Sequence, residues 1–197
     1  MNTEDLEECI KGLKSKEIFF ITGCIKSGTT WVELICNNHP EISCFGEAHI
    51  FPTLKERILK AVEDQNMLIQ KKNADIFDGI ESLKSFNGGD FQNILKYIIL
   101  LLYNKCVDKS KNVKLIGEKT PDYLFHLNDI KNIFPNSKII IINRDGRDVA
   151  VSAWYHSMRI SKDWLMKEYN NFDNYAIKFA DYWNKCVITS FDYESRN

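Results

Sequence analysis

The chain of 197 residues is 44% apolar and 12% aromatic, and its formal net charge is -1. This composition suits one globular domain with a hydrophobic core, and the near-neutral charge argues against non-specific binding to nucleic acid. No apolar run reaches the roughly 20 residues that a membrane-spanning helix needs. We therefore expect no nucleic-acid partner and no membrane span, and any anion site must be local.

Strands and helices alternate along the sequence. The run of four isoleucines in SKIIIINR, which has polar residues on both sides, is the clearest indication of a buried strand. Strands separated by helices predict an α/β fold with three layers, in which helices flank a central parallel β-sheet. In chain order we expect a strand at 18–22, a helix at 29–37, a short strand and loop at 39–52, a helix at 54–71, a surface excursion at 73–90, a helix at 91–107, a strand leading to Pro121, a helix at 122–134, a strand at 137–144, and helices at 148–158 and 172–189.

The six cysteines are scattered and include no C-x-x-C pair. The N-terminal stretch MNTEDLEECIKGLK is acidic and amphipathic, unlike a signal peptide. We therefore expect reduced thiols, no zinc site and a cytoplasmic location.

Polar residues follow three of the predicted strands, in the segments TGCIKSGTT, GEKTPDY and NRDGRD. In open parallel sheets, ligands bind at the carboxyl ends of the strands. We therefore expect these three segments to meet and form a site.

The segment FFITGCIKSGTTW is similar to a phosphate-binding loop but carries its lysine at a different position. Gly23 and Gly28 have the spacing of the G-x-x-x-x-G-K-[ST] pattern, whereas Thr29 follows the second glycine and Lys26 precedes it. The main-chain amides at the start of the next helix would bind an anion, and Lys26 would add a positive charge. The alternative is an ordinary strand-to-helix turn in which the threonines cap the helix.

A second anion-binding pair follows the isoleucine-rich strand. Arg144 ends this strand, and Ser152 lies eight residues later in the following helix. An arginine can hold a phosphate through two parallel hydrogen bonds, and the serine hydroxyl could face the same anion. Alternatively, Arg144 pairs with Asp145 or Asp148 and Ser152 faces solvent.

Together these motifs resemble those of the sulfotransferases that use 3′-phosphoadenosine 5′-phosphosulfate (PAPS). IKSGTTW resembles the loop around the 5′-phosphosulfate, RDGRDVAVSAWYH resembles the motif around the 3′-phosphate, and GEKTPDYL resembles a segment between them in carbohydrate-type members. The resemblance runs from about residue 18 to residue 183 in the order of the family. It implies a P-loop-like sulfotransferase fold, PAPS as donor, adenosine 3′,5′-bisphosphate (PAP) as product, and no metal.

The resemblance also explains the displaced lysine. A loop for nucleoside triphosphates must handle a γ-phosphate and Mg²⁺, whereas the sulfotransferase donor has no γ-phosphate and needs no metal. Lys26 would neutralise the oxygen that bridges phosphorus and sulfur, and Trp31 would pack on the adenine unless it is a core aromatic. The implied cofactor-binding residues are Lys26, Ser27, Gly28, Thr29, Thr30, Trp31, Arg144 and Ser152.

An acceptor hydroxyl must lose a proton, so the resemblance also implies a general base. The histidine that cytosolic members carry after a K-T pair is absent, because Pro121 and Asp122 stand there. Another branch uses a glutamate after an H-P dipeptide, and HPEISCFGEAHIF places Glu47 twenty-one residues after Lys26. We expect Glu47 to be the base and His49 the second candidate. The alternatives are a surface ion pair for Glu47 and a packed histidine for His49.

Lys119, in the segment GEKTP, completes the catalytic candidates Glu47, Lys26, His49 and Lys119. It would reach the transferring sulfuryl group or the acceptor. An ion pair between Glu118 and Lys119 at the strand edge is an equal alternative.

The chain departs from the family in its length. Family members continue into a further strand and a Gly- and Lys-containing loop over the cofactor, and neither is visible after FDYESRN. We expect one sulfotransferase domain over 1–197 that is incomplete at its C-terminus. The missing strand would expose a sheet edge and weaken donor binding.

The leading functional hypothesis is metal-independent, in-line transfer of a sulfuryl group from PAPS to a hydroxyl or amine of a small-molecule, carbohydrate or lipid acceptor. One alternative is a truncated or degenerate member that binds the nucleotide without turnover. A small-molecule kinase is disfavoured, because Thr29 replaces the loop lysine and no clear Mg²⁺-binding aspartate ends a buried strand. The acceptor and the oligomeric state stay open.

Overall fold

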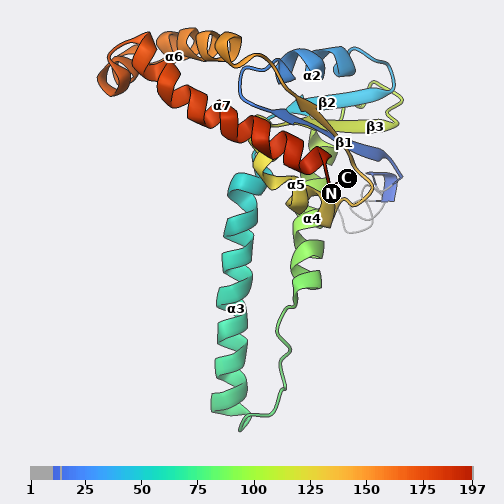
Figure 1. Ribbon diagram of the computed structural model, residues 1–197. Coiled ribbons are helices and arrows are strands. Elements are labelled where there is room, and N and C mark those ends of the chain that lie inside the picture. Colours follow the sequence, from blue (N-terminus) through green and yellow to red (C-terminus); the bar gives the residue numbers. More distant parts are fainter. Residues whose placement is uncertain (1–10, 14, 197) are drawn as a thin grey trace.

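The computed structural model describes residues 11–13 and 15–196 (Figure 1). The predicted amphipathic N-terminal segment, including Cys9, lies almost entirely outside the described residues. Cys24, Cys36, Cys44, Cys106 and Cys186 are free thiols. None of the helices in the described ranges is long and apolar enough to cross a membrane.

The centre of the fold is a parallel sheet, which the described residues form in the strand order β2-β3-β1-β4. Its strands are β1 (Glu17–Gly23), β2 (Ile42–Gly46), β3 (Leu115–Lys119) and β4 (Lys138–Ile142). β1 lies between β3 and β4, so Phe20 stands opposite Glu118 on one side and Ile139 on the other. The predicted parallel α/β fold is confirmed.

Helices cover the sheet on both faces, and two pairs of helices extend beyond it (Figure 1). In Figure 1 α3 and α4 project away from the sheet, while α6 and α7 run together as a second pair. The helices are α2 (Thr29–Asn37), α3 (Lys55–Ile76), α4 (Gly88–Cys106), α5 (Leu127–Ile133), α6 (Gly146–Tyr169) and α7 (Phe172–Glu194), with a π-helical turn η1 at Ile50–Leu54 and a 3-10 helix η2 at Pro121–His126.

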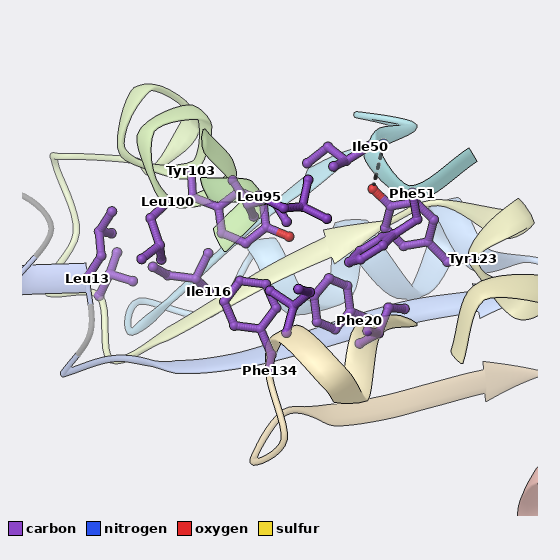
Figure 2. Close-up of a cluster of buried hydrophobic side chains, with 14 residues drawn as sticks. Leu13, Phe20, Ile50, Phe51, Leu95, Leu100, Tyr103, Ile116, Tyr123 and Phe134 are labelled. Atoms are coloured by element: carbon purple, nitrogen blue, oxygen red, sulfur yellow. Dashed lines mark hydrogen bonds between the residues drawn. The ribbon is translucent and has the colours of Figure 1, made fainter. Parts of the chain in front are cut away.

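The side chains of β1 alternate between two buried faces of the sheet, as a strand period of two requires. Phe19 and Ile21 pack on the α2 side with Cys44. Phe20 points to the opposite face, where Tyr103 of α4 and Phe134 after α5 join it. Figure 2 shows this second cluster. Because both faces of β1 are buried, its carboxyl end is held firmly, and the predicted anion loop begins there.

β4 is less buried than the isoleucine run predicts. It is an edge strand, and Ile140 is 36% exposed. Ile140 lies beside Ile21 in register and so faces the α2 side, but α2 packs over β1, β2 and β3. The prediction of a buried strand was wrong, because the hydrophobicity of a segment does not show whether the strand lies in the centre or at the edge of the sheet.

Several helix boundaries also differ from the predicted ones. The segment NGGD, expected at the end of a surface excursion, begins α4: Asn87 accepts from the amide of Asp90, and the Asp90 carboxylate accepts from the amide of Asn87. This reciprocal capping box starts the helix one turn early. α3 continues to Ile76, and α6 runs to Tyr169 across a non-helical residue, Ser161.

Candidate functional site

A cleft of about 600 Å³ opens at the carboxyl ends of the strands. It is lined by Ile25, Lys26, Gly28, Thr29, Thr30, Glu47, His49, Pro121, Asp122, Arg144, Ser152 and His156. All three segments that follow the predicted strands contribute, so the predicted convergence is confirmed. Eight of the predicted site residues line this cleft, whereas Ser27, Trp31 and Lys119 lie outside its lining.

The loop after β1 has the geometry of an anion site. Gly28 is the N-cap of α2 with φ of 106°, in the left-handed region that glycine tolerates best, and no side chain of the described residues caps the helix. The alternative in which Thr29 and Thr30 cap the helix is therefore wrong. Ser27 is 5% exposed, and its hydroxyl oxygen is buried without a hydrogen-bond partner in the described part of the chain. A buried hydroxyl without a partner is costly, so the loop is suited to receive a polar ligand.

Trp31 is not a core aromatic, because 69% of it is exposed. It lies on the outer face of α2 with Leu34 and Ile35, which are also exposed. Its contact with an adenine stays a prediction.

The second predicted pair lies at the start of α6. The Arg144 guanidinium contacts the Asp148 carboxylate at 3.4 Å, as the alternative supposed, but Arg144 and Ser152 also line the cleft. An exposed ion pair of this kind is weak, so an anion in the cleft could compete for Arg144. Asp145 is occupied by Arg147, whose side-chain hydrogen bonds lower the pKa of this carboxyl to about 2.

The candidate base Glu47 follows β2 and is held by Lys119 and His49. The Lys119 ammonium donates to its carboxylate, and His49 Nε2 lies 3.5 Å from the second carboxylate oxygen. Lys119 is 3% exposed, and its ammonium also lies 3.6 Å from a Glu33 oxygen on α2. Glu47 therefore forms an ion pair, as the alternative supposed, and lines the cleft as well. His49 is only partly buried, so it is not a packed histidine.

The hydrogen bond from Lys119 lowers the pKa of Glu47, and the charge of Lys119 and the contact with His49 act in the same direction. Glu47 is therefore ionised at neutral pH, which a general base requires. On the other side of His49, Asp122 lies 4.0 Å from its Nδ1. His49 thus lies between two carboxylates.

A buried network holds the loop that carries Glu47 and His49. Glu118 accepts hydrogen bonds from the hydroxyls of Tyr103 and Tyr123 and from the Ala48 amide. The Tyr123 hydroxyl in turn accepts from the Ile50 amide at 3.0 Å (Figure 2). The predicted alternative of a Glu118–Lys119 pair is therefore wrong, because each has other partners.

Three predicted catalytic residues have left-handed backbones. Lys26, Glu47 and His49 have φ values of 64°, 55° and 48°. Such conformations are uncommon outside glycine and are enriched at functional sites, where the surrounding structure maintains them. All three line the same cleft.

A family model described as "Sulfotransferase family" matches residues 19–193. This chain belongs to the sulfotransferase family. Its similarity to individual sulfotransferases is distant: human protein-tyrosine sulfotransferase 1 is 27% identical over 180 residues, which are 89% of this chain and 42% of that protein. Protein-tyrosine sulfotransferase 2 of Gallus gallus is 25% identical over 146 residues, or 74% of this chain and 34% of that protein.

Two further proteins are similar to this sulfotransferase-family chain. An uncharacterized protein of Aquifex aeolicus is 27% identical over 154 residues, or 77% of this chain and 19% of that protein. The crystal structure of a sulfotransferase from Mycobacterium avium has 14% identity and a TM-score of 0.49, and the match covers 98% of this chain and 59% of that one. The chain spans less than half the length of the relatives that it matches by sequence.

His156 is a cleft residue that sequence reasoning missed in this member of the family. It follows Ser152 by four residues on α6, a spacing that places both side chains on one helix face and could have revealed it. Burial and the charge of Lys26 lower the pKa of His156. Its Nδ1 faces the Arg159 guanidinium at 3.2 Å, and because arginine can only donate, the neutral ring carries its proton on Nε2. Glu33 was also missed, since nothing in the sequence connects it to Lys119.

Proposed function

We propose that this chain binds PAPS in the cleft and transfers its sulfuryl group to an acceptor hydroxyl. The observation that carries the proposal is the convergence of two distant motifs in one cleft. Lys26 lies in the loop after β1, whereas Arg144 and Ser152 lie more than 100 residues later in the sequence, at the start of α6. All three line the same cleft, and so does Glu47.

The residues present fit the donor that the family implies. Among the described residues the buried Ser27 hydroxyl has no partner and α2, whose N-cap is Gly28, has no side-chain cap, so this loop is suited to the 5′-phosphosulfate. Arg144 and Ser152 would hold the 3′-phosphate, and the exposed Trp31 would pack on the adenine. When bound, PAPS would supply the sulfuryl group together with a good leaving group. Lys26 would stabilise the charge that develops on the bridging oxygen.

Glu47 would take the proton of the acceptor hydroxyl. It lines the cleft and is ionised at neutral pH, because Lys119 lowers its pKa. The same contact weakens Glu47 as a base, so an acceptor that draws the carboxylate away from Lys119 would restore its basicity. His49 would orient Glu47 or replace it, and Lys119 would keep a positive charge beside the reacting groups.

The acceptor class is best tested with hydroxyls of different acidity. Two relatives are named protein-tyrosine sulfotransferases, so a tyrosine-containing peptide is the first acceptor to test. Carbohydrate, lipid and small aliphatic hydroxyls form the second group.

The test is calorimetric titration of the 197-residue chain with PAP in metal-free buffer. We expect a Kd in the micromolar range (about -8 kcal/mol), and we expect Lys26→Ala and Arg144→Ala each to weaken binding at least about tenfold. Lys178→Ala, an exposed lysine of α7, is the matched control and should bind like the parent chain. A folded chain that does not bind PAP would refute the proposed donor site.

Turnover is measured separately with PAPS and the acceptor panel. Glu47→Gln should retain PAP binding and lose roughly 10²–10⁴-fold in kcat. Binding of PAP without transfer to any acceptor would instead assign this chain the role of a nucleotide-binding protein.

A further inference from the structure

The arm formed by α3 and α4 has one face that packs on other parts of the chain and one that the described residues leave free. On the used face, Ile69 is buried, and Asn66 and Asn73 bind the connector between the helices. The Asn66 side chain exchanges two hydrogen bonds of 2.8 Å with the backbone of Phe86, and the Asn73 side chain exchanges two with the backbone of Leu83, of 2.8 and 3.0 Å. Figure 1 shows the connector and α4 on the same side of α3.

The opposite face of α3 is exposed over its whole length. Its residues recur every three or four positions, which places them on one side of the helix. Met67 and Leu68 stand in the middle, 60% and 48% exposed. From the N-terminal to the C-terminal end, the face consists of Lys60, Asp64, Met67, Leu68, Lys71 and Asp75, all of them exposed.

The charges on this face are arranged symmetrically about its apolar centre. Asp64 lies three residues before Met67, and Lys71 lies three residues after Leu68. Lys60 and Asp75 lie seven residues before and after the same pair. Each pair at equal distance from the centre therefore has opposite charge, so a helix packed antiparallel against a copy of itself would bring opposite charges together.

We propose that this face of α3 is a self-association surface, on which a second copy of the chain docks with its α3 antiparallel. Met67 and Leu68 of the two copies then meet at the twofold axis. Lys60 pairs with Asp75 of the other copy, and Asp64 pairs with Lys71 of the other copy. The surface is independent of the cleft and of its proposed activity.

The charge pattern favours this occupant over an unrelated partner, because every ionic contact is made twice in the symmetric pair. Within one copy, Lys60 lies 3.3 Å from Asp64, but an exposed pair of this kind is weak and is readily exchanged. A helix of 22 residues is about 33 Å long. One face of a single helix buries less area than a standard protein–protein interface. We expect a weak dimer, with a Kd on the order of 10 µM.

The test uses two variants of opposite charge. Lys60→Asp with Lys71→Asp makes all four charged positions acidic, and Asp64→Lys with Asp75→Lys makes all four basic. Sedimentation velocity from about 1 to about 100 µM measures association. The parent chain should dimerise with rising concentration, and each variant alone should weaken dimerisation at least about tenfold, since like charges then meet.

An equimolar mixture of the two variants is the decisive sample. It should form heterodimers, because each acidic position of one chain then faces a basic position of the other. Lys162→Asp with Lys178→Asp, on exposed positions of α6 and α7, changes the net charge by the same amount as the acidic variant and should dimerise like the parent chain. Circular dichroism checks that the variants are folded. A parent chain that is monomeric at about 100 µM, or a mixture that associates no better than its components, would overturn the proposal.

Discussion

Glu118 and Lys119 are neighbours in the sequence, yet their side chains point to opposite faces of the sheet, as in any strand. Glu118 is 0% exposed and accepts from two tyrosine hydroxyls, whereas Lys119 is 3% exposed and contacts carboxylates. A buried charge is tolerated only with close partners. β3 therefore contributes one supported charge to each face, and the Glu118 network fixes the loop that carries Glu47.

Replacement of Glu118 by glutamine should change stability in a way that depends on pH. Burial raises the pKa of Glu118 above its ordinary value of 4.5, although its hydrogen bonds oppose this. The folded chain thus binds more protons than the unfolded chain just above pH 4.5, and its stability falls as pH rises through the folded pKa. Glutamine does not titrate, so Glu118→Gln does not lose stability in this way. The free energy of unfolding of the variant, relative to that of the parent chain, should therefore rise with pH by up to about 1.4 kcal/mol per pH unit.

Urea unfolding of both proteins at several pH values between about 4.5 and 7 measures this difference. Glu63→Gln, at an exposed position of α3, is the control and should run parallel to the parent chain. Parallel curves for Glu118→Gln would mean that Glu118 has an ordinary pKa.

Among individual site residues, the sequence predicted those that belong to contiguous motifs. Lys26, Gly28, Arg144 and Ser152 line the cleft because each is fixed by its distance from a strand end. Glu33 could not be found this way, since its contact with Lys119 depends on how α2 lies across the sheet. Contacts between residues that are far apart in the sequence depend on tertiary packing, and the spacing of residues in the sequence does not reveal them.

The start of α6 is shaped by a helix that comes much later in the chain. The indole of Trp183, on α7, donates to the Arg144 carbonyl at 3.0 Å and covers Gly146. A β-carbon at Gly146 would lie 2.7 Å from the indole, too close for any real contact. α7 therefore fixes the backbone beside the arginine proposed to bind the 3′-phosphate.

Gly146→Ala should displace the indole and disturb Arg144. We expect a loss of about 1–3 kcal/mol in the free energy of unfolding and weaker PAP binding, because the added methyl overpacks this contact. Trp183→Phe removes the donated hydrogen bond, which should cost about 0.5–1.5 kcal/mol, and adds a further loss because the phenyl ring is smaller than the indole. Gly88→Ala is the matched control, since its β-carbon would meet no atom of the described residues within 4 Å. Chemical unfolding and PAP titration measure both effects, and equal results for the two glycine variants would contradict this account.

The type of an element was predictable where a clear hydrophobic pattern continued over the whole element. β1 and α2 lie close to their expected ranges because a buried strand, a glycine turn and an amphipathic helix follow one another directly. α4 was predicted one turn short, since Gly88 and Gly89 indicate a turn while Asn87 and Asp90 form a capping box. The capping signal was present in the sequence and outweighs the glycines.

For the whole molecule, the proposed donor site predicts that PAP stabilises the entire fold. At about 100 times its Kd, a ligand adds about 2.7 kcal/mol to the free energy of unfolding. A chain of this size gains roughly 2–4 °C in Tm per kcal/mol, so we expect a rise of about 5–10 °C. Differential scanning calorimetry measures it, with Lys26→Ala showing little or no rise at the same PAP concentration. The same rise in the variant would show that PAP binds elsewhere.

The position of β1 in the sheet has a consequence for how the molecule is made. β1 is the first described strand in the chain, but Glu17 pairs beside Leu115 and Phe19 pairs beside Lys138, so both its neighbours are synthesised about 100 residues later. At a synthesis rate of roughly 5–20 residues per second, several seconds pass between the synthesis of β1 and that of β3 and β4. During this time β1 has neither of the strands with which it pairs. The loop that follows it comes early in the sequence and is therefore among the last parts of the molecule to reach its final form.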